Sequence, residues 1–399
     1  MRVGFYTWGS CFVESPGPDG PDPYSRHHSA VDYERAYAAM LVWAKRADAL
    51  GYDSFWLTEH HFQREGYEVV PNVVLLASVF AQHTRRITFG SFFHVVPTWH
   101  PLRIAEDLAL ADLLTGGRVV FGAGRGSVER EARVFGVGFG RNGDDGDRQN
   151  RELFEEQMEI IRLAWTEPEF AFHGKHYTIP PEGILNTGNI QTGRPWRKLS
   201  LVPQPKRPIR IYQACSSDET LEMCARAANT GVLTLAGGLQ RTRARWQLFG
   251  EHLEQTHGRR VSSGEKRMLV VSVHLAEDRA SALAEVGPPL VERARFLAQQ
   301  RPVGTAADGT PLPVNYVPPI DEMVERGNIM VGSVDDVREQ LLDIVATLGA
   351  EEIAVEMGFP GMLEDAVTRQ IELFATGVRP ALDRFSDRAV RPVAAAVAG

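Results

Sequence analysis

Short apolar runs alternate along the chain with stretches in which apolar residues recur at helical spacing. The recurring stretches predict helices over about 33–50, 72–82, 100–114, 148–165, 279–299, 334–348 and 363–377, with one more starting near 216. The apolar runs that predict strands are 2–8, 53–58, 87–93, 118–122, 209–214, 232–235, 268–275 and 352–357.

Units of strand and then helix, repeated in series, favour parallel strands joined by helical crossovers. Eight strands is the number that closes a (β/α)8, or TIM-like, α/β barrel, and we favour that fold. An open doubly wound sheet is the alternative, although it usually has fewer strands.

Two segments rich in proline and glycine break the alternation, at about 167–207, with a small hairpin near 170–177, and at about 301–331. We therefore expect a single barrel domain over 1–380 with insertions after the fourth helix and before the eighth strand, followed by a frayed tail over 381–399. Long loops in compact domains are usually functional or disordered, so we expect 301–331 to form a lid over a ligand. Its apolar side chains would be Tyr316, Val317, Ile320 and Met323.

Composition narrows the class of protein and its partners. The 399 residues carry a formal net charge of −8, which gives no reason to expect a nucleic acid or an anionic membrane as partner. The three cysteines form no disulfide framework, and no run approaches the roughly 18 apolar residues of a membrane span. The sequence also begins without an apolar signal core, and we expect a reducing, cytoplasmic location.

The motif Thr58-Glu59-His60-His61-Phe62 places titratable side chains at the carboxyl end of the predicted strand 53–58. That end of a barrel strand is where chemistry is done. Adjacent histidines on extended backbone point to opposite faces, so one of them can face the barrel mouth. An ordinary histidine, with a pKa near 6.5, suits proton transfer at neutral pH. The alternative is that both are ordinary polar loop residues.

Two further motifs indicate where an anion could bind. The run from Gly122 to Ser127 has the spacing GxGxG, which supports a Rossmann site poorly; it predicts a loop close to a ligand with Arg125 as an anion clamp, or else a tight turn with a surface arginine. The run from Ser216 to Thr220 predicts a helix start, which is either plain capping or a phosphate seat. The histidines at 60, 61, 94 and 100 lack a zinc-ligand spacing, and we predict no metal.

In order and spacing, four strings resemble the luciferase-like family of flavin-dependent monooxygenases, whose type member is the bacterial luciferase α subunit. They are 51–62, 96–103 with the acidic pair at 106–107 behind it, 117–126 and 133–136. The resemblance covers nearly the whole chain. It implies a TIM-like barrel that holds reduced FMN at the carboxyl ends of the strands.

The resemblance also implies roles for individual residues. His60 matches the family's active-site histidine, Arg125 the arginine near the flavin phosphate, and Arg151 resembles a second one. Ser217 and Thr220 match hydroxyls that hold the phosphate. Phe92-Phe93 falls where the family has a non-proline cis peptide beside the flavin ring. The chain departs from luciferase at Phe92, Phe93, Gly124 and Ser216, where luciferase has small residues, a cysteine and a glutamate, and this argues against light emission and a long-chain aldehyde substrate.

The function that the resemblance implies, and that we favour over two alternatives, is that of an FMNH2- and O2-dependent monooxygenase acting through a flavin C4a-(hydro)peroxide. No nicotinamide site is evident, so a separate reductase would supply the reduced FMN, and a homodimer is expected. Trp8, Phe92, Phe93 and Trp99 at strand ends suggest a small, flat, apolar or aromatic substrate. The alternatives are an F420-dependent oxidoreductase, which shares the barrel, and a non-catalytic flavin-binding barrel.

Overall fold

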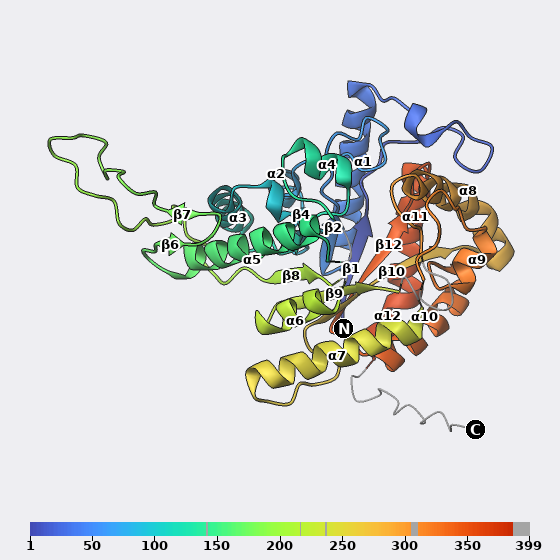
Figure 1. The fold of residues 1–399 in the computed structure, drawn as a ribbon. Helices are drawn as coiled ribbons and strands as arrows, with labels where there is room; N and C mark the ends of the chain where they lie inside the picture. Colours follow the sequence, from blue (N-terminus) through green and yellow to red (C-terminus); the bar gives the residue numbers. More distant parts are fainter. Residues whose placement is uncertain (141–142, 216, 236–237, 305–309, 386–399) are drawn as a thin grey trace.

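Eight parallel strands form a barrel in the computed structural model, which describes residues 1–140, 143–215, 217–235, 238–304 and 310–385 (Figure 1). They are β1 (Arg2–Thr7), β2 (Ser54–Leu57), β3 (Thr88–Ser91), β5 (Phe121–Gly124), β8 (Ile211–Ala214), β9 (Thr230–Thr234), β10 (Arg267–Leu275) and β12 (Glu352–Gly358). Their order is β3-β2-β1-β12-β10-β9-β8-β5, and a bridge between Phe89 and Val119 joins β3 back to the chain leading into β5. Two short strands, β4 (His94–Val95) and β11 (Met330–Gly332), extend the sheet. The predicted barrel is confirmed.

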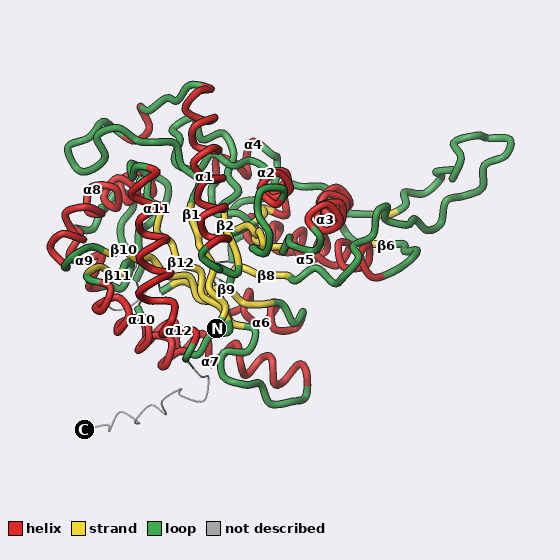
Figure 2. Tube along the Cα trace, turned by 180° about the vertical axis from the view of Figure 1, so that it is seen from behind, coloured by secondary structure: helices red, strands yellow, loops and turns green. Residues whose placement is uncertain are grey.

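Helices surround the barrel (Figures 1 and 2). They are α1 (Ala30–Ala49), α2 (Val73–Ala81), α3 (Pro101–Thr115), α4 (Glu129–Val134), α5 (Asp145–Thr166), α6 (Asp218–Arg226), α7 (Leu239–His257), α8 (Arg279–Ala298), α9 (Ile320–Glu325), α10 (Val334–Leu348), α11 (Glu364–Leu373) and α12 (Arg379–Asp383), with short turns at Pro23–Ser25, Val96–Thr98 and Phe374–Val378. Local sequence explains several boundaries. Ser29 and Asp32 form a capping box at the start of α1, and Gly116, at φ 68°, ends α3 in the left-handed conformation that glycine adopts readily. No helix in the described ranges is long and apolar enough to cross a membrane.

Large side chains fill the barrel interior. Trp56 is fully buried there, stacked on Phe92 with ring centroids 4.2 Å apart. Glycine on the neighbouring strand makes this possible, because a Cβ at Gly90 would lie 2.3 Å from the Trp56 ring. Tyr212 packs edge-on against the same indole. The interior is therefore a packed core, so a ligand can bind only at an end of the barrel.

The segment after α5 contains the expected hairpin, formed by β6 (Phe172–His173) and β7 (Thr178–Ile179). Beyond it, a long two-stranded loop projects from the body of the molecule (Figures 1 and 2). Leu185 and Pro195 form a bridge within this arm, which we define as residues 182–197. The base of the arm folds back along α5, where the backbone N–H groups of Lys175 and Tyr177 donate to Glu156, and the Tyr177 ring packs edge-on against His100 at the start of α3.

The segment before β12 differs in organisation from the expected lid. β11 pairs in parallel with the last residues of β10, so α8, the following loop, α9 and β11 together form one excursion at the carboxyl end of the barrel. The crossover helix to β12 is α10, which confirms the helix predicted over 334–348. Met323 is buried against α8, and Val317 and Ile320 pack in the same cluster. These apolar side chains therefore hold the excursion together, and the lid over a ligand stays a prediction.

Candidate functional site

His60 lies directly after β2 between two acidic side chains. Its Nδ1 is 3.0 Å from an Oε1 of Glu131 on α4, and its Nε2 is 3.1 Å from Oε1 of Glu68. Burial lowers the pKa of His60, but the two carboxylates outweigh burial and raise that pKa to about 10. The side chain is therefore an imidazolium at neutral pH, so the expected pKa near 6.5 is wrong for His60.

Glu59, the residue before it, is a buried acceptor that organises the neighbouring loop. It accepts hydrogen bonds from Nδ1 of His94 at 2.6 Å, from the backbone N–H of Val95 at 3.2 Å and from the indole N–H of Trp99 at 2.9 Å. Burial raises the pKa of Glu59, but hydrogen bonds from His61 and His94 more than compensate and lower it to about 2. Glu59 thus stays ionised and fixes the chain between β4 and α3.

Four aromatic side chains were expected together at the mouth, and the structure groups three of them. Trp8, Phe92 and Phe93 belong to the barrel interior, where Phe92 also packs edge-on against Tyr6 at 5.3 Å. Trp99 lies elsewhere: it packs on the outer core between sheet and helices and turns its indole toward Glu59. The peptide bond between Phe92 and Phe93 is cis, as the resemblance implied.

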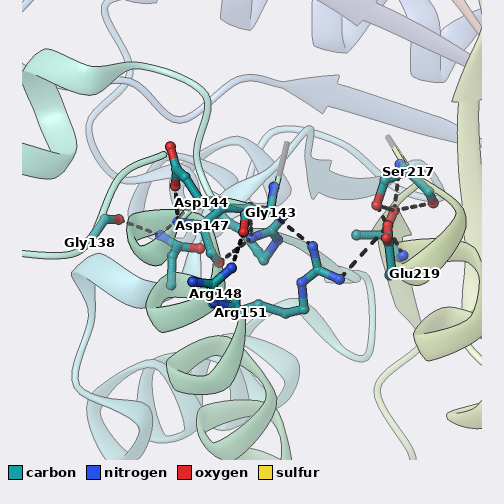
Figure 3. Close-up of polar contacts among 11 residues, drawn as sticks. Gly138, Gly143, Asp144, Asp147, Arg148, Arg151, Ser217 and Glu219 are labelled. Atoms are coloured by element: carbon teal, nitrogen blue, oxygen red, sulfur yellow. Dashed lines mark hydrogen bonds and ion pairs between the residues drawn. The ribbon is translucent and has the colours of Figure 1, made fainter. Parts of the chain in front are cut away.

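Two arginines, one directly after β5 and one near the start of α5, form ion pairs with the same carboxylate. Arg125 Nη1 lies 2.8 Å from Oδ1 of Asp147, and Arg151 Nη2 lies 3.1 Å from Oδ2 of the same residue. Burial raises the pKa of Asp147, but the hydrogen bond and charge of Arg125 outweigh it and lower that pKa below its usual value. Asp147 therefore orients both guanidinium groups. In Figure 3 Arg151 reaches from α5 toward Asp147 on one side and Glu219 on the other.

The start of α6 completes this group. Ser217 is the N-cap, and its hydroxyl accepts from the backbone N–H of Thr220, while the Thr220 hydroxyl accepts from the N–H of Ser217. Glu219 Oε2 lies 3.8 Å from Arg151 Nη1. We call Arg125, Arg151, Ser217 and Thr220 the anion seat. Ser216, also expected to contact the cofactor, lies outside the described residues.

The glycine-rich run comes close to the aromatic cluster. A Cβ at Gly124 would lie 2.8 Å from the Cβ of Phe93, so the absence of a side chain lets β5 approach the cis peptide. Gly126 has φ 86°, which directs the chain away after Arg125. A short helix, α4, begins at Glu129, although no helix was expected directly after this run.

Several partners in the site were not foreseen from the sequence. Glu68, Glu131 and Asp147 lie in loops or helices whose own patterns carry no signal for them, and only the fold brings them to His60 and the arginines. An ion pair between Arg293 of α8 and Glu356 of β12 also lies toward the barrel mouth, with Nη1 of Arg293 2.5 Å from Oε1 of Glu356. Within the described ranges, no group of three or more histidine, cysteine or acidic side chains is placed to hold a metal ion.

The fold and these groups define a TIM-barrel protein whose candidate site residues gather near the carboxyl ends of the strands. Comparison with known families is more specific: the family described as luciferase-like monooxygenase matches residues 23–352. The chain belongs to the luciferase-like monooxygenase family.

Curated relatives are distant but cover most of the chain. A Sinorhizobium fredii protein, uncharacterized protein y4wF, is 27% identical over 333 residues, spanning 83% of this chain and 88% of the relative. The 4-hydroxyprotoasukamycin monooxygenase of Streptomyces nodosus subsp. asukaensis is 26% identical and spans 85% of each chain.

Solved structures share the fold. Monooxygenase RslO1 from Streptomyces bottropensis superposes with a TM-score of 0.74 at 21% identity, covering 96% of this chain and 100% of that one. The oxygenating constituent of 3,6-diketocamphane monooxygenase from Pseudomonas putida, solved with FMN, gives 0.71 at 20% identity, covering 96% and 98%. An F420-dependent secondary alcohol dehydrogenase gives 0.60 at 13% identity, covering 98% and 99%.

Proposed function

We propose that this chain is an FMN-dependent monooxygenase that uses reduced FMN from a separate reductase, together with O2, to oxidise a small apolar or aromatic organic substrate. The observation that carries the proposal is the anion seat. Two arginines and a helix N-terminus from separate parts of the chain, 125, 151 and 217–220, meet at the ends of β5 and β8, beside an aromatic barrel interior. A flat ring bearing a phosphate fits such a pairing.

The seat has capacity for a phosphate. Arg151 Nε is buried and makes no hydrogen bond to the described residues, so one donor waits for an acceptor. The α6 N-terminus adds its positive dipole end. Glu219, with its side chain 60% exposed and only 3.8 Å from Arg151, can move aside when an anion arrives. Arg125, Arg151, Ser217 and Thr220 would thus hold the phosphate.

Reduced flavin, when bound, supplies the activation of O2. The protein's task is to orient, to exclude water and to manage protons. The His60 imidazolium, held between Glu68 and Glu131, is the proton-handling group in this proposal. The aromatic cluster of Trp8, Phe92 and Phe93 would keep water from the ring.

The two-component arrangement rests on the lack of a motif for nicotinamide. The GxGxG run leads to α4, a helix of only 6 residues whose N-cap, Val128, makes no side-chain capping bond. In a Rossmann site the glycine-rich turn opens directly into the helix whose N-terminus holds the pyrophosphate, and α4 does not match that arrangement. We place the reaction in a reducing cytoplasm, because Cys11, Cys215 and Cys224 are all free and buried thiols.

One experiment separates this proposal from its alternatives. Oxygen uptake and product mass spectrometry would be followed with chemically reduced FMN, with reduced F420 and with no cofactor, over a library of small ketones, phenols and terpenes. Substrate-dependent O2 uptake with FMN alone supports the proposal. Turnover with F420 and without O2 would show the oxidoreductase, and FMN binding without any substrate-dependent uptake would show a non-catalytic barrel.

We also propose a homodimer formed through α2 and α3. These helices pack side by side and expose an apolar strip, each side chain at least 44% exposed: Leu75 and Val79 on α2 and Leu110, Leu113 and Leu114 on α3. Apolar strips of this kind are uncommon on monomer surfaces. A two-fold axis would set the strip against its copy, which gives each leucine an apolar partner.

A further inference from the structure

One layer of the barrel interior is polar on one side only. Tyr6 of β1 lies opposite Glu356 of β12 in the strand register, and Glu356 lies opposite Ser272 of β10. All three share the inward side with Trp8, Val270 and Ala354, because side chains two residues apart on a strand point the same way. The Ser272 hydroxyl donates to Oε2 of Glu356. This polar arc therefore faces the barrel axis next to the aromatic cluster.

Arg293 extends the arc from the α8 excursion. Its Nη1 lies 2.5 Å from Oε1 of Glu356. Its guanidinium also stacks over the rings of Trp8 and Phe359, at 5.2 Å and 4.8 Å from their centroids. The ion pair leaves the arc with no net charge, and the two rings fix the guanidinium plane.

Donors remain free in this arc. Tyr6 Oη makes no hydrogen bond to the described residues, and Arg293 donates to them only through Nη1. Burial raises the pKa of Tyr6 well above its usual value, so its hydroxyl stays protonated and can donate. Two groups, one phenol and one guanidinium edge, therefore await an acceptor on the same side of the mouth.

Strand order places the arc across the barrel from the anion seat. Going round the barrel, the sequence is β1, β2, β3, β5, β8, β9, β10 and β12. β5 and β8, which carry the anion seat, are thus diametrically opposite β12 and β1, which carry Glu356 and Tyr6. A cofactor anchored at the seat would extend across the mouth toward the arc, and a second molecule laid on its ring would meet the arc.

We propose that Tyr6 and Arg293, with Glu356 and Ser272 as their support, bind the carbonyl or phenolic oxygen of a neutral, flat substrate. We infer a neutral substrate because Glu356 balances the charge of Arg293, so the arc offers hydrogen-bond donors but no net positive charge to attract a carboxylate. Flatness follows from Trp8 and Phe92 on either side of the arc. This inference rests on the proposed function, since it names the substrate class of that site.

The test measures binding, not turnover, on protein saturated with oxidised FMN. Calorimetry would give the dissociation constants of 1-tetralone, of tetralin, which has the same shape without the oxygen, and of tetralin-2-carboxylate. The readout is the dissociation constant of tetralin divided by that of 1-tetralone, which reports what the oxygen contributes to binding. We expect this ratio to fall by about three- to tenfold in Tyr6→Phe. It should fall by roughly ten- to a hundredfold in Arg293→Met/Glu356→Gln, which removes both members of the ion pair together.

A matched ion-pair control is Arg46→Met/Glu372→Gln, which removes a pair between α1 and α11 away from the mouth and should leave the ratio unchanged. An unchanged ratio in both arc variants would overturn the inference, as would tightest binding by the carboxylate. If the double variant does not fold, Tyr6→Phe, which loses a single oxygen, decides alone. Failure of wild-type protein to bind FMN would instead count against the proposed function, since FMN affinity is measured separately.

Discussion

Arg125 is the residue whose removal tests the anion seat most directly. A charge-assisted hydrogen bond to phosphate contributes about 1.5–3 kcal/mol, so Arg125→Ala should weaken FMN binding by roughly ten- to a hundredfold. Riboflavin, which lacks the phosphate, should lose much less. Fluorescence titration of both flavins measures the difference. Arg133→Ala, an exposed arginine paired with Glu129 on α4, is the control, and equal losses for FMN and riboflavin would show that Arg125 does not touch the phosphate.

His60 is expected to act on protons and not on flavin affinity. General acid–base groups contribute about 10²–10⁴-fold, so His60→Gln should lower turnover by that factor while FMN affinity stays close to wild type. Steady-state rates and flavin titration measure the two effects. His61→Gln is the control, because His61 contacts Glu59 and the ring of Phe135 instead. A large loss of turnover in His61→Gln but not in His60→Gln would show that His61, and not His60, faces the barrel mouth.

The same histidine gives stability a definite pH dependence. The folded pKa of about 10 lies above the unfolded value near 6.5, so its contribution is complete below about pH 6.5 and disappears as the pH rises through about 10. The pKa of Glu68 is lowered, mainly by the charge of His60 acting against burial, so its contribution needs a pH above about 4.5. The stability difference between wild type and His60→Gln, measured by urea unfolding, should therefore be largest between about pH 4.5 and 6.5. A difference that grows toward pH 10 would contradict this.

At the scale of single residues, some members of the candidate site could be predicted from the sequence and others could not. His60 and Arg125 could be found because each follows an apolar run that ends at the barrel mouth. Glu68, Glu131 and Asp147 could not, because an acidic residue in a loop or helix looks the same whether it faces solvent or an arginine. The raised pKa of His60 is a property of those hidden partners, which is why the pKa expected for an isolated histidine was wrong.

At the scale of elements, the strip on α2 and α3 makes the strongest prediction. Leu110→Lys/Leu114→Lys should convert a dimer to a monomer, because two buried ammonium groups would cost more than the apolar contact contributes. Light scattering after size-exclusion chromatography measures the mass, and circular dichroism checks the fold. The control is Val31→Lys, on α1 and 51% exposed. A wild-type protein that is monomeric at every concentration would remove the basis of this proposal.

Element prediction succeeded where pattern and length agree. The eight strands have apolar runs that leave little choice, and α5 shows its apolar face clearly. α7 went unplaced, although Trp246, Phe249 and Leu253 recur at helical spacing and are buried. The role of α8 could not be read locally, because only the pairing of β11 with β10 shows that this helix stays at the carboxyl end.

At the scale of the whole molecule, the arm and the site should be independent. The hairpin at the base of the arm folds back along α5, but the arm itself projects from the body of the molecule (Figures 1 and 2), and among the described residues no hydrogen bond or ion pair joins 184–196 to the anion seat. Replacing 184–196 by a short glycine–serine linker should therefore leave FMN affinity within about twofold of wild type. Fluorescence titration measures this, with Arg125→Ala as the variant expected to weaken FMN binding. A tenfold loss of FMN affinity would mean that the arm reaches the mouth.

The placement of the two polar groups on opposite walls of the barrel has an evolutionary consequence. The wall formed by β5, β8 and the starts of α5 and α6 holds one set of charges, while β1, β12 and the α8 excursion hold the other. The excursion is a single stretch of chain that leaves after β10 and returns at β11. On the proposed function, exchanging that stretch would replace Arg293 and its surroundings while leaving Arg125, Arg151 and Asp147 in place, so a descendant could acquire a new substrate without rebuilding the opposite wall.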